Sequence, residues 1–150
     1  MTIELTPAQY ETLLKLVYLG EWMANGIRTE EERDEKIHQA AQHFYSYADE
    51  ADAGALIEYD KEYHQYVSTP ALDDDAEIVR FREEYDDEVF WDELIEKLAM
   101  RDFANRYGEE HWFSGGVQDG SDIQSGFINK YVDEFEANGI GNLIIKGDEL

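Results

Sequence analysis

The sequence predicts an all-α protein, a compact bundle of five or six helices that forms a single acidic helical domain over residues 1–150. Apolar side chains recur at the 3.6-residue spacing of helices along most of the chain. Hydrophobic residues make up 43% of the sequence and aromatic residues 13%, which is enough to build a core. Proline occurs only twice and no stretch rich in Pro, Ser or Gly separates two bodies, so one domain with one core is expected.

The first helix is predicted over residues 7–24. Thr6 offers a capping hydroxyl, Pro7 suits the first helical position, and Gln9 can complete a capping box. Apolar residues follow in two rows, with Tyr10, Leu13, Leu14, Val17 and Tyr18 in the first and Leu16, Leu19 and Met23 in the second. Two apolar faces indicate a central, heavily buried helix, and Asn25-Gly26 supplies a left-handed stop.

Two further helices are predicted before Pro70. Thr29 and Glu32 form another capping box, and the helix that they begin runs to Gly54. Residues 55–68 are predicted as a third helix, because the residue before a proline avoids helical backbone and the preceding apolar residues keep helical spacing. The side chains that carry this pattern are Leu56, Tyr59, Tyr63, Tyr66 and Val67.

The fourth and fifth helices follow the acidic run 73–75, which offers several N-terminal caps. The fourth helix places Ile78, Phe81 and Tyr85 inward. The fifth extends from about residue 88 to residue 107 and stops at Gly108. Its apolar residues are Phe90, Trp91, Leu94, Ile95, Leu98 and Phe103. Together with the helix at 7–24, the fifth helix is expected to form the core.

The C-terminal part begins with a change of composition after Gly108, where Gly, Ser, Gln and Asp predict an irregular loop to about Gly120. A last helix is predicted over residues 123–137, capped by Ser121 or Asp122. The tail Leu143-Ile144-Ile145 is short, apolar and mostly β-branched. It is the candidate for a short C-terminal extended segment, with no partner strand evident in the sequence.

The net charge of -24 arises from 36 acidic and 12 basic residues. Residues 51–100 hold 16 of the acidic and 4 of the basic residues, and so carry half of the net negative charge. Direct nucleic-acid binding is disfavoured, because its affinity comes mainly from Lys and Arg that neutralise phosphates, and anionic membranes are disfavoured for the same reason. The partners that remain are a basic protein or a second copy of the chain, giving a homo-oligomer.

The location expected from the sequence is cytosolic. No basic and apolar leader opens the chain, and no 18 apolar residues run together. The absence of Cys fits a reducing compartment and excludes thiolate catalysis and cysteine-bound metal centres. No glycine-rich phosphate loop, dinucleotide fingerprint or nucleophile motif is found, so no cofactor is expected and enzymatic activity is left open.

Two acid–histidine pairs are candidates for chemistry. Glu35 and His38 form one Glu-x-x-His step of the kind used in di-iron bundles, but such a site needs a second step, which the sequence lacks. Asp60 and His64 are four residues apart, so on a helix the carboxylate could orient the imidazole as a general base. Neither pair by itself assigns a catalytic residue or a metal ligand.

A set of four carboxylates suggests an alternative function. Glu58 and Glu62 would share a face of the predicted third helix and could hold Mg²⁺ together with Glu83 and Asp86. In residue type this set resembles the acidic helical sites of nucleotide pyrophosphohydrolases, although the separation differs and no basic phosphate-binding cluster accompanies it. The resemblance implies a divalent-metal-dependent hydrolase of a phosphorylated small molecule.

The acidity of the surface has three interpretations: solvated faces that serve solubility, adaptation to high salt, or a functional acidic face. Trp112 and Phe113, in a predicted loop, either close the base of the core or anchor an interface. The candidate interaction surface therefore comprises Asp73, Asp74, Asp75, Trp112 and Phe113. We expect a non-catalytic cytosolic interaction or accessory protein with an acidic surface; the hydrolase, and an acidic DNA-mimic inhibitor of a nucleic-acid-binding protein, are the alternatives.

Overall fold

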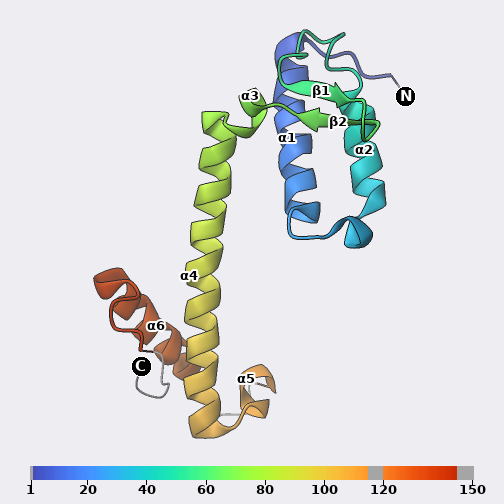
Figure 1. The fold of residues 1–150 in the computed structure, drawn as a ribbon. Helices are drawn as coiled ribbons and strands as arrows, with labels where there is room; N and C mark the ends of the chain where they lie inside the picture. The colour runs from blue at the N-terminus through green and yellow to red at the C-terminus, as the bar shows by residue number, and fades with distance from the viewer. Residues whose placement is uncertain (1, 115–119, 145–150) are drawn as a thin grey trace, which may run out of the picture. The chain divides into compact units, whose positions relative to one another are not determined.

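The computed structural model confirms the all-α class, with six α-helices and one two-stranded sheet among the described residues, 2–114 and 120–144 (Figure 1). The side chains of residues 113, 114, 120 and 121 lie outside the description. Contacts along the chain divide it into two compact units, Met1–Glu83 (unit 1) and Glu84–Leu150 (unit 2). Each unit has its own cluster of buried side chains, where the sequence analysis expects one core.

Helix α1, Pro7–Asn25, begins as the sequence predicts. The Gln9 N–H donates to the Thr6 hydroxyl at 3.3 Å, and the Gln9 side-chain oxygen accepts from the Thr6 N–H at 3.0 Å. These two bonds satisfy donors that the first helical turn leaves without intrahelical partners. The predicted capping box is therefore confirmed at both of its bonds.

The prediction that α1 is buried on two faces is wrong. Tyr10 and Leu14 are buried, because α2 packs on this side of α1. Of the second apolar row, Leu16 is 60% exposed and Met23 is 56% exposed, whereas Leu19 packs against the core of unit 1. Leu13, from the first row, is 36% exposed. Helical spacing identifies the apolar rows of a helix but not how many of them receive a packing partner.

The end of α1 also differs from the prediction. Gly26 has right-handed backbone, with φ of -61°, so it is not the left-handed stop that Asn25-Gly26 suggests. Asn25 instead fixes the start of the next helix: its side-chain oxygen accepts from the Asp34 N–H at 2.8 Å. The Asn25 side chain therefore bonds to the residue that caps α2, and the predicted left-handed cap of α1 does not form.

The predicted helix from Thr29 to Gly54 is shorter than expected and lies in separate pieces. Thr29 and Glu32 do form a capping box, but it begins only the single 3₁₀ turn Glu30–Glu32. Helix α2, Glu35–Tyr45, starts at Asp34, whose carboxylate accepts from the N–H groups of Lys36 and Ile37. The chain after Tyr45 forms turns rather than further helix.

Residues 55–68 form a β-hairpin, so the predicted third helix is wrong. Strands β1, Ile57–Asp60, and β2, Gln65–Ser68, are antiparallel, with Ile57 opposite Ser68. The Asp60 carboxylate accepts from the N–H groups of Glu62 and Tyr63, which closes the turn locally. Aromatic and β-branched residues at these positions suit a half-buried strand as well as a helix, and this turn chemistry favours the strand.

Gln42 of α2 anchors the hairpin. Its amide nitrogen donates to the Tyr66 carbonyl and its amide oxygen accepts from the Tyr66 N–H, each at 2.7 Å. A two-stranded hairpin is marginal alone, and its outer edge carries backbone groups that need partners. The Gln42 amide satisfies one such pair on β2 as a third strand would.

Helix α4, Ala76–Tyr107, replaces the predicted fourth and fifth helices, and the short helix α3, Pro70–Asp73, precedes it. The two predicted helices merge because no Gly or Pro interrupts residues 76–107. Gly108 ends the helix with φ of +94°, as predicted. The boundary between the two units falls within this helix.

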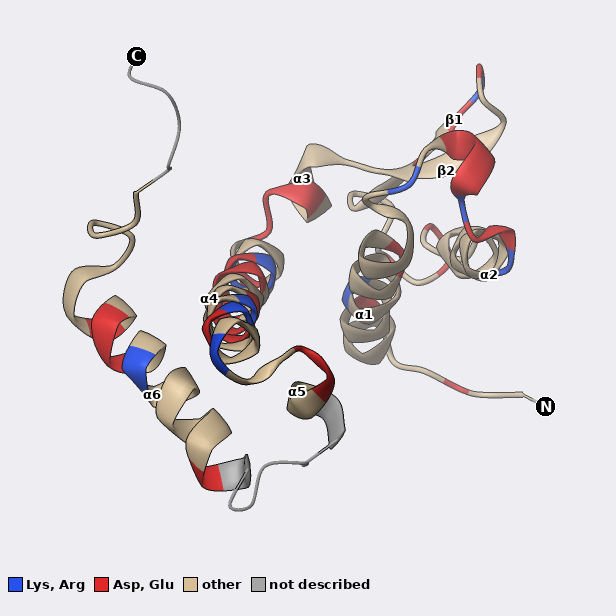
Figure 2. Cartoon of the chain, turned by 90° about the horizontal axis from the view of Figure 1, so that it is seen from below, with Lys and Arg blue, Asp and Glu red and all other residues tan. Residues whose placement is uncertain are grey.

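The middle of α4 has no packing face. Residues 83–90 are all exposed, and acidic residues are spread along the helix (Figure 2). Between residues 83 and 96 there are eight acids and no Lys or Arg: Glu83, Glu84, Asp86, Asp87, Glu88, Asp92, Glu93 and Glu96. Like charges four residues apart destabilise a helix, so this segment is the least supported part of α4.

Unit 2 continues with α5, Glu110–Ser114, where a loop is predicted, and with α6, Gly120–Asn138, which includes the predicted last helix. Gly139 follows α6 with φ of +53°. Leu143 and Ile144 adopt no strand, and Ile145 lies outside the described residues. Among the helices that the structure describes, none is both long and apolar enough to cross a bilayer.

The two faces of α1 give a direct test of these packing assignments. Leu14→Ala should lower the free energy of unfolding by about 2–5 kcal/mol, because the side chain is fully buried and its loss leaves a cavity. Leu16→Ala should change it by less than about 0.5 kcal/mol in dilute solution. Urea denaturation followed by circular dichroism measures both, and equal losses would contradict the one-sided burial of α1.

The acidic segment of α4 gives a second prediction. Glu88→Lys places a cation four residues from both Glu84 and Asp92, and should stabilise the local helix by about 0.5–1 kcal/mol. Slower amide hydrogen exchange across residues 83–90 would show this. Glu88→Gln, which removes repulsion without adding attraction, should have a smaller effect in the same direction. Unchanged exchange in both variants would show that repulsion does not limit this segment.

Candidate functional site

The acidic run 73–75 is used largely for internal contacts. The Tyr18 hydroxyl donates to the Asp73 carboxylate at 2.9 Å, and Arg82 donates to the Asp73 carbonyl at 2.9 Å. The Asp75 carboxylate accepts from the N–H groups of Glu77 and Ile78, so it is the cap of α4. Asp74 is exposed. The sequence predicted a cap in this run, and the structure places it at Asp75.

Asp75 also holds α1 to the start of α4. Lys15 Nζ lies 2.9 Å from Asp75 and 3.4 Å from Glu77. The Lys15 hydrogen bond lowers the pKa of the Asp75 carboxyl, and the same bond raises the pKa of the Lys15 ammonium. One of the few cations of the chain is thus placed where the cap of α4 and Glu77 of α4 meet α1.

Trp112, the other part of the predicted interaction surface, packs against the core of unit 2. Its ring is half-buried and meets the Phe103 ring edge to face, with the centroids 5.2 Å apart. Gln124 of α6 donates to the Trp112 carbonyl at 2.6 Å. The side chain of Phe113 lies outside the described residues. The placement of Trp112 corresponds to the core-closing alternative.

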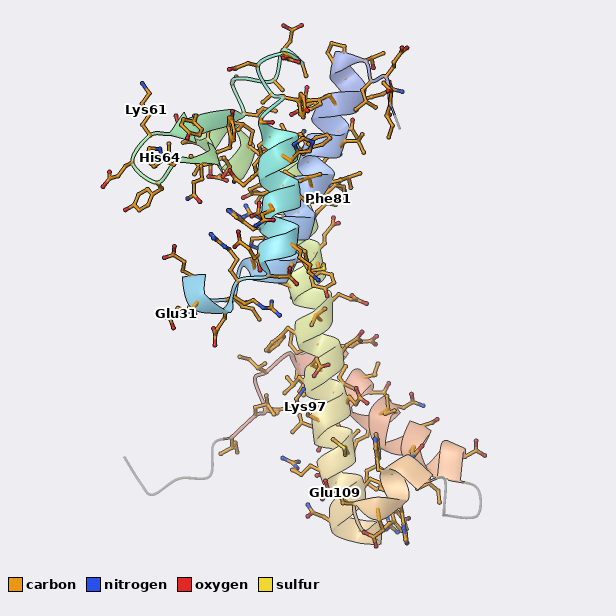
Figure 3. The ribbon with its side chains drawn as sticks, turned by 90° about the vertical axis from the view of Figure 1, so that its right-hand side faces the viewer. Glu31, Lys61, His64, Phe81, Lys97 and Glu109 are labelled. Atoms are coloured by element: carbon orange, nitrogen blue, oxygen red, sulfur yellow. The ribbon has the colours of Figure 1, made fainter. Side chains whose placement is uncertain are left out.

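The predicted carboxylate set does not come together as a helix face. Glu58 is on β1 and Glu62 is in the hairpin turn, so the shared face that the sequence analysis assumes is absent. In Figure 3, Lys61 and His64 project outward from this turn. The Asp60 carboxylate is occupied in closing the turn, where it accepts from the Glu62 N–H. Across the described residues, no three His, Asp or Glu side chains are grouped so that they could hold a metal ion.

His38 has a carboxylate partner, but not the predicted one. His38 Nδ1 lies 2.6 Å from Glu21 Oε1 of α1, whereas Glu35 pairs with Arg33 and Gln39. The Tyr45 hydroxyl donates to the other Glu21 oxygen at 3.1 Å. Glu21 is 17 positions from His38 in the sequence, so no local spacing could have identified the pair.

The Glu21–His38–Tyr45 cluster borders a small pocket of about 260 Å³. Burial and the Glu21 carboxylate raise the pKa of the Tyr45 hydroxyl, which therefore stays protonated as a hydrogen-bond donor. Glu21 could orient the imidazole of His38 as a proton acceptor. The pocket volume falls below the 300–1,000 Å³ typical of small-molecule sites, and the cluster serves to join α1 to α2.

In unit 2 the strongest polar cluster is centred on Asp102 of α4. Its carboxylate accepts from Tyr131 at 2.5 Å, from Arg101 at 2.8 Å and from Lys130 at 3.0 Å. Burial would raise the pKa of Asp102, but hydrogen bonds from Tyr131, Arg101 and Lys130 outweigh it and hold the pKa well below its usual range. These contacts tie α6 to α4.

A groove of about 790 Å³ lies beside the Asp102 cluster. Its walls carry both apolar side chains, such as Leu98 and Phe135, and the ion-paired Asp102, Arg101 and Lys130. These three charged groups are therefore already engaged with one another, and Glu134, which also lines the groove, accepts from Asn138 and Asn142. The contacts of Asp102 stabilise the packing of α6 on α4, and the residues that line the groove do not by themselves indicate a ligand.

The most distinctive exposed feature is on α1. We define the α1 outer face as Leu13, Leu16, Gly20 and Met23. Leu13, Leu16 and Met23 are 36%, 60% and 56% exposed, and a Cβ added at Gly20 would meet nothing within 4 Å. Ile27, just beyond the helix, continues the row and is 93% exposed. The face is apolar and open along its length.

The α1 outer face is also free of charge. The only charged residues of helix α1 are Glu11, Lys15 and Glu21. Because successive residues turn by about 100°, these three side chains project roughly 100–140° away from Leu16 around the helix axis. Lys15 and Glu21 are engaged with α4 and α2. In Figure 2 most of α1 is accordingly neither acidic nor basic. The sequence analysis placed Leu13 in one apolar row and Leu16 and Met23 in another, and interpreted both rows as core.

No protein-family model, curated protein or solved structure matches this chain. What the protein does must therefore be inferred from its own residues.

The Asp102 cluster predicts how stability depends on pH. Asp102→Asn should lower the free energy of unfolding at pH 7 by about 1–2 kcal/mol, because hydrogen bonds to a charged acceptor are lost. The lowered pKa means that the contribution of Asp102 is present above its unfolded pKa, declines as pH falls below that value, and is lost completely only below the folded pKa. The difference between wild type and variant should therefore shrink in acid.

The matched control for this prediction is Asp92→Asn, which removes an exposed carboxylate of the same helix. Its effect at pH 7 should stay within about 0.5 kcal/mol. Urea denaturation at several pH values measures both variants. A constant difference between wild type and Asp102→Asn from neutral to acid pH would contradict the role given to the charge.

Proposed function

We propose that this protein is a non-catalytic interaction protein of the cytosol, and that it binds another protein chain through the α1 outer face. The single observation that carries the proposal is that Leu13, Leu16 and Met23 form an exposed apolar row. Contiguous exposed apolar surface on a folded chain marks an interaction site. The acidic remainder of the surface keeps the free chain soluble.

The contrast between this face and the rest of the chain strengthens the proposal. About one residue in three is charged, yet the α1 outer face contains none. Water-exposed helix positions in so acidic a chain are normally charged or polar, and burial of a leucine in an interface contributes roughly 1.5–3 kcal/mol. An uncharged apolar row is therefore best explained by a partner that covers it.

The acidic surface serves a secondary role in this proposal. The acids of α4 between residues 83 and 96 project around the whole helix, since successive residues turn by about 100°. They do not line the one elongated face that imitation of DNA requires. They can attract a basic protein, but they do not define a site of their own.

Site-specific photo-crosslinking tests the proposal. A benzoylphenylalanine introduced at Leu16 of the full chain should form covalent adducts with protein in lysate of the source cells. The same probe at Tyr63, which is 70% exposed in the hairpin turn, is the matched control and should form few. Mass spectrometry of the adducts then identifies the covering chain.

The proposal fails if position 16 forms no adduct, or no more than position 63. It also fails if the adducts of position 16 join only residues of the same molecule, at the mass of one chain. Adducts at twice the mass of the chain, or with a different protein, support it.

A further inference from the structure

We propose that the chain covering the α1 outer face is a second copy of this protein, with two α1 helices packed antiparallel about a two-fold axis. This inference rests on the proposed function and names the partner of the same face. It is carried by the spacing of the apolar residues, by their pairing when the face meets itself, and by the absence of charge.

The spacing suits another helix as the covering element. Leu13, Leu16, Gly20 and Met23 follow one another at intervals of three, four and three residues, and Ile27 comes four residues later. This is the alternation of a heptad seam, in which a narrow apolar row packs against one helix. The buried row of α1, which faces several elements at once, is broader and includes Tyr10, Leu14, Val17 and Tyr18.

The pairing is self-complementary in the antiparallel direction. With the two-fold axis at the level of Tyr18, Leu13 of one copy lies opposite Met23 of the other, and Leu16 lies opposite Gly20. Each large side chain at the centre therefore meets a glycine with open space above it. A parallel pair would set Gly20 against Gly20 and leave a gap where the antiparallel pair has leucine.

Charge restricts where a second copy can bind. Each chain carries -24, so two copies repel each other over most of their surfaces. Contact is least costly where neither copy has charge, and the α1 outer face meets that condition. A basic partner would instead gain most by contacting the acidic segments, where it could pair its own charges.

The size of the contact sets its strength. Helix α1 has 19 residues and is thus about 28 Å long, so one helix pair buries less area than the ~1,600 Å² of a standard interface. We therefore expect a reversible dimer that depends on protein concentration.

Sedimentation equilibrium of the purified full chain tests the proposal at concentrations up to about 100 µM. Wild type should approach a dimer mass, and Leu16→Glu should weaken association at least about 10-fold, because it places a carboxylate in the seam. The matched control is Tyr63→Glu, which adds the same charge at an exposed aromatic position and should change the dissociation constant by less than about 2-fold.

Salt dependence separates this dimer from binding to a basic protein. Raising the salt from about 0.05 M to about 0.5 M screens repulsion between like chains, so association of two copies should strengthen. Binding to a basic partner would weaken under the same change. A self-association that weakens with salt overturns the proposed contact.

The absence of Cys allows the direction of the helices to be tested by single cysteines. In the antiparallel arrangement, a mixture of Leu16→Cys and Gly20→Cys chains of different mass should form the mixed disulfide more readily than either variant forms its own. Glu11→Cys, on another side of α1, should form little. Preferential linkage of like positions overturns the antiparallel pairing.

The two proposals fail in different ways. A chain that stays monomeric at every concentration and salt, while photo-adducts with a different protein form at position 16, overturns the second copy and leaves the proposed function standing. A dimer that Leu16→Glu does not weaken overturns the assignment of this face. If the chain is monomeric and position 16 forms no adduct, both proposals fail.

Discussion

Mutual repulsion among 36 carboxylates is the constraint under which this chain folds, because only 12 cations are available to offset them. The described residues include no fully buried charged group, so the acids remain at or near the surface. Two of the cations hold helices together. Lys15 joins α1 to the acidic start of α4, and Lys130 of α6 meets Asp102 of α4. Acids elsewhere, as in the middle of α4, remain in water.

Neutral hydrogen bonds also join elements within unit 1. Gln42 pairs with both backbone groups of Tyr66 and fixes the hairpin on α2, while Asn25 bonds to Asp34 between α1 and α2. Neither bond adds charge to a chain that already repels itself. Carboxylates join elements here as well: Asp73 accepts from the Tyr18 hydroxyl of α1. The Glu21 carboxylate is partly buried between His38 and Tyr45, each of which contacts one of its oxygens.

The same constraint explains why the α1 outer face stands out. Exposed leucine is ordinary on most proteins, but here the exposed surface is dominated by acids, and an apolar row without a single charge is unusual within it. One helix therefore has two roles. Its inner side, with Tyr10 and Leu14, builds the core of unit 1, and its outer side is available to another chain.

Local chemistry in the sequence determined the all-α class, the capping box at Thr6, the cap within residues 73–75 and the stop at Gly108, because each depends on a few neighbouring residues. Tertiary structure decided the rest. The apolar pattern of 55–68 fits helix and strand alike, and contacts with Gln42 accompany the hairpin. The Glu21–His38 pair and the Asp102 cluster join distant segments, which spacing cannot reveal. Periodicity likewise placed Leu16 in an apolar row of the helix. Only the packed structure shows whether such a row contacts the protein's own core or stays exposed, because burial depends on which residues are neighbours in space.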